Sequence, residues 1–198
     1  MFGILWAWFA VEPAPMATDD ELVRAALQGD RRAYSELYRR HVTSLFRYAL
    51  SLTRNQIEAE DLLQEVFIQA FNKLSQYQGP NIFKRWLFRI CRNMAFNRKA
   101  KRKVEESPME SHAEITLGAR EPQKEWLKDL EVQESTQRLL GSLSPELQEI
   151  MLLRLVEDLS YREISEITGL TEVNLRQMIS RGLGKLRKEW SAHAVHQT

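Results

Sequence analysis

Residues 159–186 read LSYREISEITGLTEVNLRQMISRGLGKL, and this stretch has the spacing of a helix-turn-helix. Ser160 and Glu163 form a capping-box pattern, which satisfies free backbone N–H groups at a helix start. Gly169 ends that helix because glycine readily adopts the positive φ of a tight turn, and Thr171 then caps a longer helix. The pattern predicts a DNA-reading motif, with an ordinary helical hairpin carrying a solvated polar face as the alternative.

The longer helix has two different faces when its residues are placed at about 100° per residue. An apolar side is expected to pack into the core and consists of Leu175, Ile179, Leu183, Leu186 and Trp190, with Met178 at its edge. The opposite side carries Val173, Asn174, Gln177, Ser180, Arg181, Gly184 and Lys188. These side chains suit a major groove, because Asn or Gln can pair with adenine and Arg with guanine or phosphate.

The rest of the chain also has helical spacing, and no stretch alternates as a strand does. Helices are expected at residues 19–28, 31–53, 56–74, 82–101, 124–141, 145–156, 161–168 and 172–190. Val104 to Pro122 contains two prolines, one glycine and many charges, which is typical of a linker. The sequence therefore predicts an all-α fold of two small helical domains, divided into an N-terminal extension (1–17), a first domain (18–101), a flexible linker (102–123), a helix-turn-helix domain (124–191) and a tail (192–198).

The chain begins with MFGILWAWFAVEPAP, in which the apolar run from Met1 to Val11 is too short to span a bilayer. The run also lacks the basic start and the cleavage site of a signal peptide. Two interpretations stay open: a membrane-touching or self-inhibitory segment, or a native protein that starts at Met16.

Composition excludes several kinds of site. Cys91 is the only cysteine and the four histidines share no metal-ligand spacing, so neither an internal disulfide nor a Cys-based zinc site is expected, and no cofactor is predicted. The net charge is only +1, but Lys84 to Lys103 holds nine Lys or Arg and no acid. Such a segregated basic stretch attracts phosphates even in a nearly neutral protein. The composition fits a reducing cytoplasm.

The helix expected at 82–101 combines this charge with aromatic rings. Its core stripe is Phe83, Leu87, Ile90, Cys91 and Met94, and the opposite side carries Arg85, Trp86, Phe88, Arg89, Arg92, Asn93, Phe96 and Lys99. Cations that follow phosphates and rings that stack on bases are what unpaired DNA requires. The loop from Gln76 to Ile82 is placed to hold a flipped base. In the alternative, Trp86 or Phe88 packs against the helix expected at 31–53 or against the other domain.

The helix expected at 56–74 has a core stripe of Leu63, Val66, Phe67, Ala70 and Leu74. Its other face shows Glu58, Asp61, Glu65, Gln69 and Asn72, with Ile68 among them. An acidic face centred on an apolar residue suits docking against a basic protein surface, and a plain solvated face is the alternative.

Two long segments together resemble one family. EAEDLLQEVFIQAFNKLSQYQGPNIFKRWLFRICRNMAFN (58–97) is similar to region 2 of the extracytoplasmic-function (ECF) sigma factors of bacterial RNA polymerase. LSPELQEIMLLRLVEDLSYREISEITGLTEVNLRQMISRGLGKLR (143–187) is similar to their region 4. The order is right, and no region 3 domain lies between them.

With the faces assigned above, the resemblance implies three binding sites. The segment that docks on the β′ clamp helices of core RNA polymerase contains Glu58, Asp61, Gln64 and Glu65. The part that reads and melts the −10 element contains Gly79, Asn81, Phe83, Arg85, Trp86, Arg89, Arg92 and Asn93. The part that reads the −35 element contains Thr171, Val173, Asn174, Arg176, Gln177, Ser180 and Arg181. Residues 143–156 are expected to meet the β-flap.

The resemblance further implies a non-enzymatic, cytoplasmic specificity subunit that binds promoter DNA and is held inactive by an anti-sigma factor, often at the inner membrane. The sequence departs from the common pattern at Met178 and near Leu183, where Arg is frequent, and at Pro80-Asn81-Ile82 in the loop, where a smaller, more polar run is usual. Fewer cations on the recognition helix predict fewer phosphate contacts or a −35 sequence unlike the commonest one, and the loop leaves the −10 base preference open.

Two other classes of protein remain as rivals. A stand-alone helix-turn-helix regulator would bind half-sites as a symmetric dimer, but it leaves the acidic and the aromatic–basic helices unexplained. An enzyme acting on nucleic acid would need a phosphate-binding loop, a metal cluster or a nucleophile–base pair, and the sequence offers none of these.

Overall fold

The computed structural model describes residues 17–105 and 141–195, and every regular element in these two ranges is helical. The first range contains α1 (Asp19–Leu27), α2 (Arg31–Thr53), α3 (Gln56–Asn72), the short 3₁₀ turn η1 (Leu74–Gln76) and α4 (Phe83–Glu105). The second contains α6 (Pro145–Met151), the π-helical turn η3 (Leu152–Val156), α7 (Tyr161–Thr168) and α8 (Glu172–Val195). The predicted all-α class is confirmed.

Local signals fix most helix boundaries. Thr18 and Ser160 each form a complete capping box, with Glu21 and Glu163 respectively. Gly169 has φ 77° and ends α7 in the left-handed conformation that the turn requires. These features lie where the sequence predicted helix ends.

Some expectations need correction or lie outside the described residues. α4 continues to Glu105 instead of ending near residue 101, and the helix expected at 145–156 is α6 followed by a π-helical turn. The expected helix at 124–141 falls almost wholly on residues that the structure does not describe, as do the apolar segment 1–15 and the side chain of Trp190.

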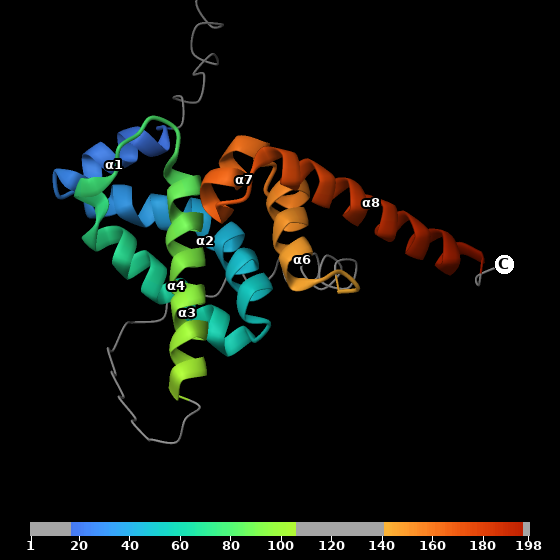
Figure 1. Cartoon of the computed structure of the whole chain (residues 1–198). Coiled ribbons are helices and arrows are strands. Elements are labelled where there is room, and N and C mark those ends of the chain that lie inside the picture. Colours follow the sequence, from blue (N-terminus) through green and yellow to red (C-terminus); the bar gives the residue numbers. More distant parts are fainter. Residues whose placement is uncertain (1–16, 106–140, 196–198) are drawn as a thin grey trace, which may run out of the picture.

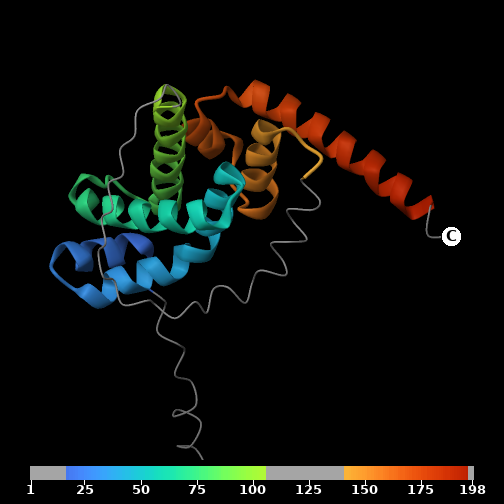
Figure 2. The ribbon, with the colours of Figure 1, turned by 90° about the horizontal axis from the view of Figure 1, so that it is seen from below.

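The helices form two groups that lie side by side (Figure 1). α1 to α4 make one group and α6 to α8 the other; α4 contacts α7, and α2 contacts α6. A continuous apolar core runs through both groups. Figures 1 and 2 both show the C-terminal part of α8 extending away from all other helices.

One aromatic residue of α4 and one leucine of α8 lie on the face opposite to the one expected from the sequence. Phe88 was assigned to the outer face of α4 but is fully buried, with its ring centroid 4.8 Å from that of Tyr48 on α2. The alternative interpretation, in which Phe88 packs against the helix at 31–53, is therefore the correct one. Leu183 was assigned to the core but is 44% exposed.

Gly182, the neighbour of Leu183, explains this second difference. α6 approaches α8 so closely there that a Cβ at residue 182 would lie 2.9 Å from Met151 Sδ and 3.3 Å from Leu147 Cδ1. Because α6 rests against the bare backbone of Gly182, the neighbouring Leu183 is turned toward solvent.

This close approach gives a paired prediction. Gly182→Ala and Gly184→Ala both gain helix propensity, but a Cβ at residue 184 meets nothing within 4 Å. The free energy of unfolding of Gly182→Ala should therefore be about 1–3 kcal/mol lower than that of Gly184→Ala, because only the first substitution overpacks the core. Urea denaturation of the two variants measures this difference, and equal stabilities would contradict the packing described here.

Candidate nucleic-acid interface

The seven residues assigned by sequence to duplex reading lie on the exposed face of α8 and at its N-cap. Thr171, Val173, Asn174, Arg176, Gln177, Ser180 and Arg181 are each exposed. Thr171 Oγ1 accepts from the Asn174 backbone N–H at 3.3 Å, as a helix cap does. Leu175 and Ile179 are buried on the other side, so packing against the core turns the polar face outward.

Contacts within the helix-turn-helix orient Arg176. Its Nη2 lies 3.2 Å from Glu172 Oε2, and its guanidinium carbon is 5.0 Å from the ring centroid of Tyr161 on α7. A guanidinium above an aromatic face is held by a cation–π attraction. The α7 helix thus helps to set the direction of a side chain on the exposed polar face of α8.

Three basic residues of α4 form ion pairs with carboxylates from the second helix group. Lys84 Nζ lies 2.9 Å from Glu157 Oε2, Arg85 Nε lies 2.9 Å from Glu166 Oε2, and Arg92 Nε lies 2.8 Å from Glu149 Oε1. Two of these cations, Arg85 and Arg92, belong to the set predicted to bind DNA. A phosphate approaching either of them in this arrangement meets a competing carboxylate.

Two of the three carboxylates are buried and accept further bonds from α2. Glu149 accepts from Tyr48 Oη at 2.7 Å, and Glu157 accepts from Arg47 Nε at 3.1 Å and Nη2 at 3.0 Å. Burial raises the pKa of Tyr48 well above its ordinary value, and the Glu149 charge adds to this rise. Tyr48 therefore stays protonated and remains a donor to Glu149.

A small pocket lies where base capture was predicted. It measures about 50 Å³ and is lined by Ile82, Arg85, Trp86, Arg89 and Glu166. Trp86 is half-buried, and its ring centroid lies 5.7 Å from that of Tyr77. The pocket brings together three residues of the predicted set, Arg85, Trp86 and Arg89, and its lining is completed by Ile82 and by Glu166 of α7.

The other residues of the predicted −10 set take different positions. Phe83 is 1% exposed and lies behind Trp86, with ring centroids 5.8 Å apart, so in this arrangement it supports the pocket and does not line it. Gly79, Asn81 and Asn93 are exposed. Sequence reasoning missed the three acids that face α4, although Glu149 stands in an apolar run where a charge is expected only if it is paired.

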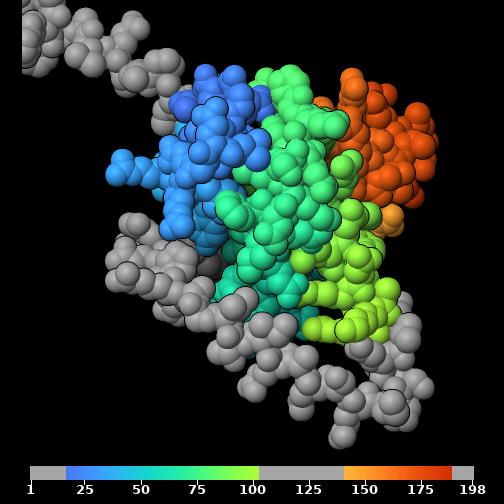
Figure 3. All heavy atoms as spheres, turned by 90° about the vertical axis from the view of Figure 1, so that its left-hand side faces the viewer, coloured from blue at the N-terminus to red at the C-terminus, as the bar shows by residue number. Residues whose placement is uncertain are grey.

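The outer face of α3 combines acidic and apolar side chains, and α3 with the loop after it occupies the middle of the face seen in Figure 3. Asp61, Gln64 and Glu65 are exposed, and Glu58 is half-buried. Arginines of α4 pair with two of them: Arg98 with Glu65 at 2.6 Å and Arg102 with Glu58 at 2.9 Å.

The same helix exposes large apolar side chains, namely Ile57, Ile68 and Phe71 at 73%, 55% and 54%. Exposed apolar groups beside charged ones mark a surface suited to a protein partner.

Two other kinds of site were sought in the part of the chain that the structure describes. No group of three or more His, Cys, Asp or Glu side chains is arranged to hold a metal ion there. None of the helices described is both long enough and apolar enough to cross a membrane.

Two family models match the sequence. The model "Sigma-70 region 2" matches residues 37–104, and "Sigma-70, region 4" matches residues 133–186. The first match spans most of α2, all of α3 and nearly all of α4, and the second reaches into α8.

Curated relatives extend this similarity over nearly the whole chain. The chain is 34% identical over 191 residues to the ECF RNA polymerase sigma factor SigE of Mycolicibacterium smegmatis, which covers 93% of this chain and 72% of the relative. It is 30% identical over 181 residues to the ECF RNA polymerase sigma-E factor of Haemophilus influenzae, covering 85% and 93%.

Two solved structures have folds similar to that of this chain. The sigma factor RpoE of Bartonella quintana, solved with the anti-sigma factor NepR, superimposes with a TM-score of 0.58 at 25% identity, over 78% of this chain and 94% of that one. CnrH, solved with the cytosolic domain of CnrY, gives 0.60 at 24% identity over 88% and 97%, which supports the fold.

The ion pair between Glu166 and Arg85 predicts that a variant without the Glu166 charge binds single-stranded DNA more tightly. Glu166→Gln removes the carboxylate that faces the pocket, so the affinity for a short single-stranded DNA should rise about two- to fivefold, as expected for a partly exposed ion pair. Fluorescence anisotropy with a labelled oligonucleotide at fixed salt measures the change.

Asp158→Asn is the matched control, because it removes the same charge from the same helix group while its partner Arg154 belongs to neither predicted DNA-binding set. If both variants gained affinity equally, the gain would come from net charge and not from the pocket.

Proposed function

The chain belongs to the extracytoplasmic-function family of RNA polymerase sigma factors, and from this premise we propose that it binds core polymerase and selects promoters by reading their −10 and −35 elements. The observation that carries the proposal is the pair of separate DNA-suited surfaces: the exposed polar face of α8, and the Trp86 pocket with its flanking arginines on α4.

The −35 element is assigned to α8. Duplex DNA admits a helix into its major groove, and Asn174 and Gln177 are exposed amides of the kind that pair with adenine. Arg176 and Arg181 supply charge for guanine or phosphate. Because affinity from such contacts depends on counterion release, binding should weaken as salt rises.

The −10 element is assigned to the loop before α4 and to the first half of that helix. In this proposal a base leaves the duplex and enters the pocket beside Trp86, while Arg85, Arg89 and Arg92 follow the backbone. Arg85 and Arg92 are paired with Glu166 and Glu149, so DNA engagement requires α7 and α6 to move away from α4.

Core polymerase is assigned to the outer face of α3, where Asp61, Gln64 and Glu65 are exposed beside Ile68. The segment 143–156 is assigned to the β-flap. We divide the chain functionally into residues 18–101 and 124–191, joined by a linker. In this scheme it acts as a binding subunit and not as a catalyst, in the cytoplasm where RNA polymerase works.

An anti-sigma factor is part of the proposal. The Bartonella quintana relative was solved in complex with NepR, an anti-sigma factor. A partner of this class would hold the present chain away from polymerase, and one anchored in the inner membrane would keep it there.

In vitro transcription tests the whole proposal. Core bacterial RNA polymerase is supplied with a library of randomised promoters, with and without the protein, and the transcripts are sequenced. We expect new start sites that share −35 and −10 elements. The double variant Asn174→Ala with Gln177→Ala should change the recovered −35 sequence and leave the −10 sequence unchanged.

The absence of new starts with folded protein and core from the source organism would overturn the proposal. Tight binding to a palindromic duplex without polymerase would instead favour a stand-alone regulator.

Trp86→Ala separates melting from duplex recognition. Loss of the stacking ring should reduce promoter opening about tenfold or more, since stacking on one base contributes about 1–3 kcal/mol. Permanganate reactivity of thymines in the −10 region measures opening, and a gel shift on duplex DNA measures closed binding. An unchanged bubble would exclude Trp86 from base capture.

A further inference from the structure

One carboxylate from the start of α1 spans the loop that is assigned to base capture. Asp20 Oδ1 accepts from Tyr77 Oη at 2.5 Å, and Asp20 Oδ2 accepts from the Asn81 backbone N–H at 2.7 Å. The Ile82 backbone N–H in turn donates to Tyr77 Oη at 3.4 Å. Asp20 thus ties the beginning of the loop to its end.

The backbone of the loop closes over this carboxylate at Gly79. A Cβ added to Gly79 would lie 2.6 Å from Asp20 Oδ1, 3.0 Å from Tyr77 Cε1 and 3.1 Å from Tyr77 Oη. Asn81, which follows, has φ 54°, a left-handed conformation that asparagine tolerates better than most residues. The loop conformation is therefore built around the Asp20 side chain.

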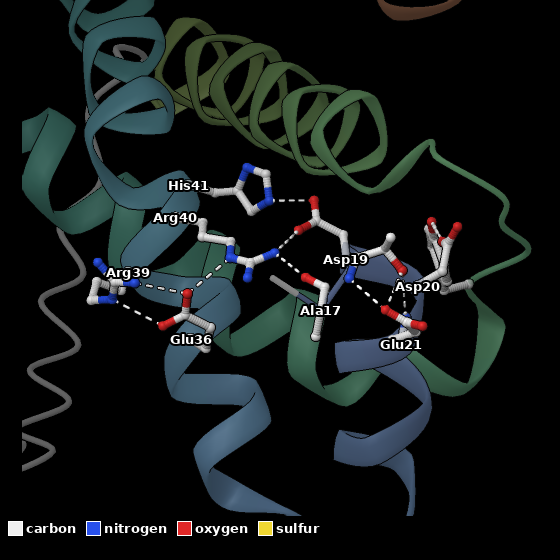
Figure 4. Close-up of polar contacts among 10 residues, drawn as sticks. Ala17, Asp19, Asp20, Glu21, Glu36, Arg39, Arg40 and His41 are labelled. Atoms are coloured by element: carbon white, nitrogen blue, oxygen red, sulfur yellow. Dashed lines mark hydrogen bonds and ion pairs between the residues drawn. The ribbon is translucent and has the colours of Figure 1, made fainter. Parts of the chain in front are cut away.

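The position of Asp20 is itself fixed by its neighbour. Figure 4 shows Asp19 pointing toward α2, while Asp20 lies on the other side of the same helical turn. Asp19 Oδ2 lies 2.6 Å from His41 Nε2, and Asp19 Oδ1 lies 3.2 Å from Arg40 Nη1.

Arg40 also donates to the Ala17 carbonyl at 2.6 Å. The bonds from His41 and Arg40 hold the pKa of Asp19 below its usual value, so Asp19 stays ionised and anchors this turn to α2.

The loop transmits this geometry to the pocket by two routes. The Tyr77 ring lies edge-on to Trp86, and Ile82 lines the pocket beside Trp86. Burial raises the pKa of Tyr77, and the bond to Asp20 adds to the rise, so the phenol remains a donor. A displaced Asp20 would shift both walls of the pocket.

We propose that Asp20 is a positioning residue for −10 recognition, which fixes the Tyr77–Ile82 loop in the shape that receives the flipped base. The inference rests on the function proposed above for the loop and for Trp86. Asp20 does not touch DNA in this scheme; it acts through Tyr77 and the Asn81 backbone.

Asp20→Asn tests the proposal in the assembled holoenzyme. The amide is uncharged and has one acceptor oxygen in place of two, so at nearly constant size it cannot accept from both Tyr77 Oη and the Asn81 N–H. One of the two loop bonds is therefore lost or reversed in direction, and both lose the assistance of the carboxylate charge. We expect open-complex formation, measured by permanganate reactivity, to fall about tenfold, as for the loss of one charge-assisted hydrogen bond. The base preference at the −10 element, read from a library randomised only there, should broaden.

Two readouts should stay within about twofold of wild type, because a side chain that acts only on the loop leaves other surfaces unchanged: affinity for core polymerase and affinity for −35 duplex DNA. Tyr77→Phe keeps the ring against Trp86 and removes only the hydroxyl, so it should act in the same direction. The double variant should cost less than the sum of the single ones, because both changes break the same bond.

Asp30→Ala is the stability-matched control. It removes the N-cap bond that the Arg32 backbone N–H donates to Asp30 Oδ1 at 2.8 Å, and within the described part of the chain no bond joins Asp30 to the Tyr77–Ile82 loop. It should lower the unfolding temperature without changing the −10 profile.

Three outcomes would overturn the inference. If wild type opens promoters and Asp20→Asn matches it, Asp20 does not position the loop while the proposed function stands. If Asp20→Asn lowers opening, core binding and −35 binding alike, the role is structural. If wild type with active cognate core opens no promoter, the proposed function fails, and the inference fails with it.

Discussion

The arrangement of the two helix groups depends on carboxylates that are buried between them. Glu149 and Glu157 are almost inaccessible to water, and a charge so placed is strongly destabilising unless it is paired. Their partners Arg92, Tyr48, Arg47 and Lys84 all come from α2 and α4. The second group does not pair these two buried carboxylates by itself, so they keep their partners only while the two groups remain in contact. When the helix groups separate, water hydrates both members of each ion pair. The net free energy needed to break the pairs is therefore far smaller than their Coulomb attraction suggests. An interface of this kind is specific in its geometry and still able to open.

Apolar packing supplies the rest of the contact. The buried core is continuous from α2–α4 into α6–α7, and Phe88 and Tyr48 lie within it. Opening the interface therefore exposes apolar surface as well as ions, and a partner that takes up the open form has to cover part of it. The basic residues of α4 take part both in the closed interface and in the function proposed above. Arg85 and Arg92, which are proposed above to bind DNA phosphates, are paired with Glu166 and Glu149, so closure and the proposed DNA binding use the same cations.

Sequence reasoning succeeded where the cause was local. The ends of α2 and the capping box at Ser160 follow from neighbouring residues, and the exposed polar face of α8 follows from helical period and the burial of Leu175 and Ile179. It failed where distant contacts decided the outcome. Phe88 is buried because Tyr48 of α2 faces it, and Leu183 is exposed because α6 presses on Gly182. The acids that face α4 follow from the docking of segments far apart in the chain, which no local pattern encodes. The roles assigned to single residues in promoter reading remain predictions.

The close approach of Gly79 to Asp20 limits which substitutions either position can accept. The Asp20 carboxylate fills the volume that any larger residue at 79 would need, and Asp20 is held there by two bonds. A mutation of Gly79 alone collides with Asp20, and shortening Asp20 alone leaves a void and unpaired donors on the loop. Neither position can drift by itself without a cost, so lineages that alter one are expected to have altered the other. Residues 20 and 79, although far apart in the sequence, are therefore expected to change together.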